Sequence, residues 1–129
     1  MSLLPTDAEL DILVALWRLG PSTVREVHQA LGKPTGYTTT LKQVQVMAQK
    51  GLLSRTECYR AHVYKAATGQ EETRCRIAGD LLRRAFDGSV KDLILGALEA
   101  HPVSNEELAD ILRSLRNLKR RRKPRRPCQ

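Results

Sequence analysis

Residues 37–50 carry hydrogen-bonding side chains at a spacing that could contact a nucleic acid. Thr38, Lys42 and Gln45 fall at i, i+4 and i+7, so a helix over this range places them on one face, which Gln49 extends. That face holds hydroxyls, amides and one cation, and it holds no acid. Because such groups can reach phosphate oxygens and base edges, the pattern favours a helix that contacts DNA.

The other face of this predicted helix is apolar, which gives the helix a side to bury. Its apolar residues fall at i, i+3, i+6 and i+7: Leu41, Val44, Met47 and Ala48. Two strand-like runs follow at 52–57 and 62–66, and the polar linker between them, 58–61, contains Arg60. Helix, strand, tight connection and strand form the order of a winged helix, with Arg60 in the wing. The alternative at this point is an ordinary helix packed on a hairpin in a small α+β domain.

Two more helices are expected before this one, and each begins with a capping box. Thr6 with Glu9 begins the first, which ends before a Gly-Pro pair, and Thr23 with Glu26 begins the second. Ser22, between the two helices, is expected to be a one-residue remnant of a first strand. A short turn containing Gly and Pro then joins the second helix to the third, which gives a helix-turn-helix.

The positive charge of the chain is concentrated in two places. The net charge is +8, and residues 119–129, with seven Lys/Arg and no acid, contribute +7 of it. Residues 23–66 hold seven basic and two acidic residues, a local excess of +5. A basic surface is what a phosphate backbone requires. Residues 119–129 are expected to form a disordered, solvated tail that adds sequence-independent affinity near DNA.

Other classes of protein are disfavoured by the composition. No apolar run is long enough for a membrane span and no signal peptide is visible, so a cytoplasmic location is expected. Three cysteines, an odd number without close spacing, argue against a disulfide framework, and Cys58 with His62 alone cannot make a zinc site. The histidines are scattered, and His28 is interpreted as a surface or packing residue. We therefore expect no enzyme activity, no metal and no cofactor.

Residues 68–118 predict three further helices whose apolar stripes need a partner. The candidate dimerisation residues are Leu81, Leu82, Phe86, Leu108, Ile111, Leu112 and Leu115. Three short helices cannot bury these stripes well by themselves, so a homodimer is predicted, and the alternative is that they fold back on the winged helix. The predicted fold is mainly α with a small β-hairpin: a winged-helix DNA-binding domain at 1–67, a helical dimerisation region at 68–118 and the basic tail at 119–129.

Three stretches together resemble the penicillinase-repressor family, the BlaI/MecI/CopY group: LPTDAELDILVALWRLGPSTVREVHQAL, GYTTTLKQVQVMAQKGLL and RAHVYKAA. The resemblance covers about residues 4–118 and is most specific in the winged helix. It implies a homodimeric transcriptional repressor that binds a palindromic operator in double-stranded DNA, with the helix at 37–50 in the major groove. By position, the family's contacting residues fall on Thr38, Thr39 and Lys42. The full set of candidate DNA contacts is Thr38, Thr39, Lys42, Gln43, Gln45 and Arg60.

The chain departs from the family pattern in three places. Val46-Met47 stands where the family often has an Arg-Leu pair, which removes one expected phosphate contact. The antibiotic-responsive branch is relieved by a membrane-protease pathway that leads to cleavage of an Asn-Phe bond, and the matching stretch here, 95–98, lacks that bond. The copper-responsive branch has paired Cys-x-Cys motifs, and only Cys128 lies near this C-terminus.

Relief of repression is expected through loss of the dimer, by proteolysis or another signal. The alternative function is that of a basic RNA- or ribosome-associated protein that uses the winged helix as an interaction module.

Overall fold

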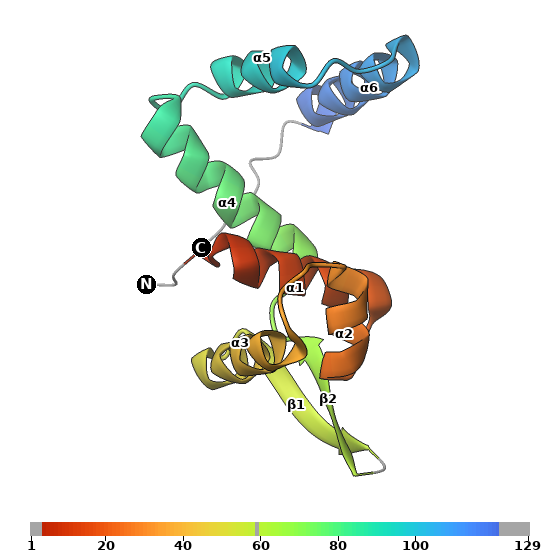
Figure 1. Cartoon of the computed structure of the whole chain (residues 1–129). Coiled ribbons are helices and arrows are strands. Elements are labelled where there is room, and N and C mark those ends of the chain that lie inside the picture. The colour runs from red at the N-terminus through yellow and green to blue at the C-terminus, as the bar shows by residue number, and fades with distance from the viewer. Residues whose placement is uncertain (1–3, 59, 122–129) are drawn as a thin grey trace. The chain divides into compact units, whose positions relative to one another are not determined.

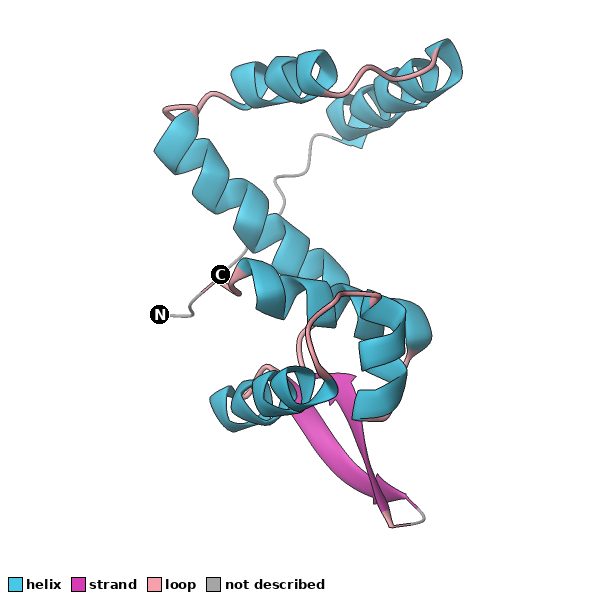
Figure 2. Cartoon of the chain, viewed as in Figure 1, coloured by secondary structure: helices cyan, strands magenta, loops and turns pink. Residues whose placement is uncertain are grey.

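The computed structural model describes residues 4–58 and 60–121. The elements are α1 (Asp7–Leu19), α2 (Val24–Leu31), α3 (Tyr37–Lys50), β1 (Leu53–Cys58), β2 (Ala61–Ala66), α4 (Gln70–Ala85), α5 (Val90–Ala100) and α6 (Asn105–Arg121) (Figure 1). The described chain is mainly helical, and its strands form one antiparallel hairpin (Figure 2). This arrangement confirms the predicted fold class, a winged helix followed by three helices. The chain divides into two compact units between Cys75 and Arg76, inside α4.

The first two helices begin where their capping boxes place them. Glu9 N donates to Thr6 Oγ1 at 3.2 Å, and Thr6 N donates to the Glu9 carboxylate at 3.0 Å, so two otherwise unpaired N–H groups of the first turn are satisfied. Thr23 and Glu26 make the same reciprocal pair at the start of α2. Both capping boxes were predicted from the sequence, and both are confirmed.

The hairpin is longer and its turn is tighter than the sequence indicated. Leu53 pairs with Ala66 and Cys58 with Ala61, so only residues 59 and 60 connect the strands. Arg60 has a φ of +68°, the left-handed conformation that two-residue hairpin turns use. Cys58 and Ala61, the first and last residues of the predicted linker at 58–61, therefore belong to the strands. Arg60 does lie at the end of the wing.

A one-residue bridge ties the hairpin to the helices. Ser22 N donates to Tyr64 O at 2.9 Å, and Tyr64 N donates to Ser22 O at 2.8 Å, which confirms the predicted remnant of a first strand. The Tyr64 side chain is buried in a core whose other members come from α1, α2, α3 and β1: Ile12, Leu13, Ala15, Leu16, Val24, Val27, Val44, Met47 and Leu53. The hairpin is thus fixed against the helices by both its backbone and its core residue.

The first turn of α4 belongs to the first unit. The helices of residues 68–118 were predicted to begin at residue 68, but α4 begins at Gln70, and the Thr68 carbonyl accepts a hydrogen bond from Trp17 Nε1 at 3.0 Å. Thr73 on the first turn is buried. These contacts join the first turn of α4 to the first unit, which extends to Cys75.

In the second unit, α5 and α6 contain no buried residue. The Ser89 hydroxyl accepts from Asp92 N at the start of α5, and the Ser104 hydroxyl accepts from Glu107 N at the start of α6. The prediction ended the last helix at residue 118, but α6 continues to Arg121, because Lys and Arg propagate helices well and their charges suit a helix C-terminus. The rest of the predicted tail, 122–129, lies outside the described residues.

Cys58 is a free, exposed thiol, whereas Cys75 is disulfide-bonded, which the odd cysteine count did not predict. None of the helices described within 4–58 and 60–121 is long and apolar enough to cross a lipid bilayer.

Candidate nucleic-acid interface

The polar face predicted for α3 is the face that the helix presents to solvent. Thr38, Lys42, Gln45 and Gln49 are all exposed, and we call this set the outward stripe. On the opposite side, the core contains Val44 and Met47, and Leu41 and Ala48 pack against it, as the periodicity predicted. A helix that buries one side this completely can offer the other to a partner without loss of stability.

The start of α3 is held by a group of side chains from α2. The Tyr37 ring lies edge-on to the His28 ring, with 5.9 Å between centroids, and the Arg25 guanidinium lies 5.4 Å from the centre of the Tyr37 ring. His28 Nδ1 and Thr40 Oγ1 are 2.8 Å apart and share a hydrogen bond. These contacts tie the first turn of α3 to α2, and they confirm the interpretation of His28 as a packing residue.

Thr40 was not recognised from the sequence as a buried residue. It is 2% exposed, whereas its neighbours Thr38 and Thr39 are exposed. The available signal was its position, because Thr40, Val44 and Met47 fall at i, i+4 and i+7 on the apolar side. Of the three consecutive threonines, two therefore face outward and one serves the packing of α2 against α3.

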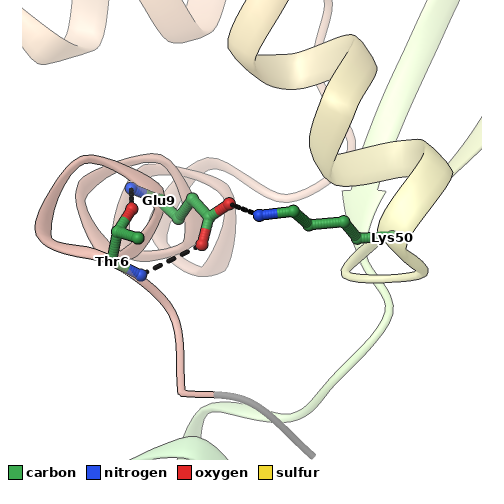
Figure 3. Close-up of polar contacts among 3 residues, drawn as sticks. All are labelled: Thr6, Glu9 and Lys50. Atoms are coloured by element: carbon green, nitrogen blue, oxygen red, sulfur yellow. Dashed lines mark hydrogen bonds and ion pairs between the residues drawn. The ribbon is translucent and has the colours of Figure 1, made fainter.

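The end of α3 is held by an ion pair to α1. Lys50 Nζ donates to Glu9 Oε2 at 2.8 Å, while the other Glu9 oxygen keeps its capping bond to Thr6 (Figure 3). Burial raises the pKa of the Glu9 carboxyl, but the hydrogen bonds from Lys50 and Thr6 and the Lys50 charge outweigh burial, so the pKa lies below its usual value. Glu9 therefore remains ionised at neutral pH and links α1 to α3.

Several hollows border α3, and two of them include residues of its first turn. One, of about 360 Å³, lies between α3 and the start of α1, and its α3 lining includes Thr38, Thr39, Lys42, Gln43 and Val46. The other, of about 490 Å³, is lined by residues of α2, α3 and the wing, among them Arg25, Tyr37, Arg60 and His62. We call them the α1-side hollow and the wing-side hollow.

The predicted contact residues are distributed over these surfaces. Thr38, Thr39, Lys42 and Gln43 line the α1-side hollow, and Gln43 is half-buried there. Gln45 lies on the outward stripe, and Arg60 lines the wing-side hollow. The sequence prediction did not include Arg25, Tyr37 or His62 in the candidate site. Their approach to Arg60 depends on how the hairpin packs beside α2, which local spacing does not encode.

The basic patch predicted for residues 23–66 is smaller than its charge count implied. Lys33 pairs with Asp11, and Lys50 with Glu9, so two of its seven cations are compensated by acids of α1. Within the part of the chain that the structure describes, no ion pair joins Lys42, Arg55, Arg60 or Lys65 to an acid. The cations that remain available lie on α2, where Arg25 contacts the Tyr37 ring, on α3 and on the wing.

Comparison with known proteins identifies the family. The model of the penicillinase repressor family matches residues 5–117. The chain therefore belongs to the penicillinase repressor family. Members of this family are DNA-binding transcriptional repressors and not enzymes, so the chain is a transcriptional repressor, as the resemblance implied.

Two curated relatives and one solved structure agree with this assignment. The chain is 34% identical over 92 residues to the transcriptional regulator BlaI of Mycobacterium tuberculosis, covering 69% of this chain and 67% of that protein. It is 24% identical over 120 residues to the penicillinase repressor of Bacillus licheniformis, covering 92% and 94%. A MarR family protein from Bacillus stearothermophilus matches 90% of this chain and 74% of its own, with a TM-score of 0.50 and 22% identity, which supports the fold alone.

Proposed function

We propose that this penicillinase-family repressor binds a palindromic operator as a homodimer, with α3 in the major groove of each half-site. The observation that carries the proposal is the outward stripe: four exposed polar residues without an acid, on a helix whose other side is buried. Side chains of these types bond base edges as well as phosphates. In this proposal the stripe, with Thr39 and Gln43 beside it, reads the operator.

The wing-side hollow would hold the sugar-phosphate backbone next to that groove. Arg25 and Arg60 both line it, on α2 and on the wing respectively, and His62 lies on the adjacent strand. His62 Nε2 is 3.7 Å from the Glu57 carboxylate, whereas no acid among the described residues pairs with Arg60. Arg60 and Arg25 are therefore the cations we assign to phosphate, and they would orient α3 without reading sequence.

Dimerisation is assigned to the second unit. Leu81, Leu108, Leu112 and Leu115 are between 38% and 47% exposed, and α6, which carries three of them, contains no buried residue. Leu82, Phe86 and Ile111 are half-buried. Phe86 also packs within the unit, because a Cβ on Gly96 would lie 3.3 Å from its ring. A second copy that covers these leucines is the simplest way to remove them from water.

Relief of repression would follow from loss of this dimer. Two winged helices joined through the second unit bind both half-sites with one association cost. Specific protein–DNA complexes reach about 10⁻⁸–10⁻¹¹ M, and non-specific ones about 10⁻⁴–10⁻⁶ M. Separation of the two copies should move affinity from the first range toward the second, whether a protease or another signal causes it.

The experiment has two stages. Selection from random duplexes should enrich one palindrome, preferred over bulk DNA by about 10³-fold or more. Molecular mass and affinity for that palindrome are then measured for Leu112→Asp and for the control Asn117→Asp, which adds the same charge at an exposed polar position of α6.

Leu112→Asp should become monomeric and lose operator affinity, and Asn117→Asp should do neither. A monomeric Leu112→Asp that binds as tightly as the parent would contradict relief by dimer loss. A Leu112→Asp that stays dimeric would show that this leucine packs elsewhere.

A further inference from the structure

Val46 is an apolar residue on the exposed part of α3. Its side chain is 37% exposed, whereas Val44 and Met47 on either side of it are buried. It follows Lys42 by four residues and Thr39 by seven, so these three side chains form one row along the helix. The row shares Lys42 with the outward stripe, and its other two residues lie on the α1 side of the stripe.

The same row lines a concave surface. Val46, Thr39 and Lys42 all border the α1-side hollow of about 360 Å³. Across the hollow, Glu9 binds Lys50 Nζ through one oxygen and Thr6 N through the other. An isolated exposed valine needs no explanation, but this one lies in a hollow among side chains assigned to base reading.

The major groove offers few apolar partners to such a residue. Thymine is the base whose major-groove edge carries a methyl group, whereas the polar groups on the edges of adenine, guanine and cytosine are hydrogen-bond donors and acceptors. A valine cannot bond an exocyclic amine or carbonyl, so in contact with those groups it would only desolvate them. Against the thymine methyl group, a valine gains van der Waals contact and covers no hydrogen-bonding group.

We propose that Val46 is a specificity-determining residue that packs against the C5-methyl group of a thymine in each operator half-site. The methyl group of Thr39 and the aliphatic part of the Lys42 side chain, in the same row, would flank the contact between Val46 and the thymine methyl group. This inference rests on the proposed binding of α3 in the major groove and adds the base that one position of the operator should contain.

The test removes single methyl groups from the DNA. In the selected operator, each thymine is replaced in turn by deoxyuridine, which keeps every hydrogen-bonding group and lacks only the methyl. For the parent protein, one thymine per half-site should show a loss of about fourfold in affinity, which corresponds to ~0.8 kcal/mol for one buried methyl group. Replacing that thymine in both half-sites should cost about fifteenfold.

Val46→Ala should bind the parent operator more weakly and should be insensitive to the same deoxyuridine replacement. Alanine at an exposed helical position favours the helix, so folding is preserved. Gln45→Ala is the control: it should weaken binding but keep the full loss on methyl removal, because Gln45 lies on the outward stripe and not in the Val46 row.

Three outcomes overturn the inference in distinguishable ways. Equal losses on methyl removal for the parent and Val46→Ala would exclude the contact while leaving operator binding intact. A selected operator without thymine would also exclude the contact between Val46 and a thymine methyl group. Failure to select any duplex would refute the proposed function itself, and this inference with it.

Discussion

The ion pair between Lys50 and Glu9 gives a stability prediction that depends on pH. Replacing Lys50 by Met keeps the apolar stem and removes the donor, so Glu9 is left in its site without its partner. Only 9% of the Glu9 side chain is exposed, against 50% for Lys50. A hydrogen bond to a charged group contributes about 1.5–3 kcal/mol. Because the Lys50 side chain is half exposed and screened, we expect Lys50→Met to cost about 1–2 kcal/mol at pH 7.

The pH dependence follows from the lowered pKa of Glu9. A carboxyl whose pKa is lower in the folded state adds stability above its unfolded pKa, about 4.3, and loses that stability as pH falls through the folded pKa. The cost of Lys50→Met should therefore be largest at neutral pH and shrink below about pH 4, as Glu9 protonates in the parent.

The assay is urea unfolding followed by the fluorescence of Trp17, the only tryptophan, which packs against the core of the first unit. Lys33→Met is the matched control, because Lys33 pairs with Asp11 and both side chains are more than 40% exposed. That exposed pair should contribute at most about 1 kcal/mol. Equal costs for the two variants, or a cost of Lys50→Met that does not change with pH, would refute the assignment of Glu9 as a link between α1 and α3.

The remaining predictions concern DNA binding. Thr39→Ala should cost on the order of 1–3 kcal/mol on the operator and far less on random DNA, measured by titration of both duplexes, and equal losses would contradict a reading role. Arg60→Gln should weaken binding to all duplexes alike and lower the slope of log affinity against log salt by about one. Arg74→Ala, which removes an exposed cation from α4, should leave that slope unchanged, and an unchanged slope for Arg60→Gln would exclude its phosphate contact.

Local patterns predicted the elements of the winged helix well. The capping boxes at Thr6 and Thr23 depend on residues three positions apart, so their geometry is fixed by the helix itself. The apolar side of α3 follows from helical periodicity in the same way. Ser22 could be placed opposite a later strand because the winged-helix order leaves room for only one residue there.

Contacts between distant elements were not accessible from the sequence. From the sequence, Lys33 and Lys50 were counted among the cations available to DNA. In the structure, Asp11 and Glu9 of α1 form ion pairs with them. The α1-side hollow depends on the start of α1 lying next to α3, and the spacing of residues within either helix does not predict it. Which residues pair over a long sequence separation is set by packing. A count of Lys and Arg residues therefore gives only the maximum number of cations that a binding surface can offer.

The contacts of α3 separate the residues that hold the helix from those that are free to read DNA. Its first turn is fixed by Tyr37 and Thr40 against α2, and its last residue, Lys50, is fixed against α1. The outward stripe lies between these attachments and takes part in neither. A helix fixed at both ends is already ordered before it meets DNA, so little conformational entropy remains to be lost on binding. Substitutions in the stripe should therefore change which sequence is bound, whereas substitutions in the attachments should change how firmly every sequence is bound.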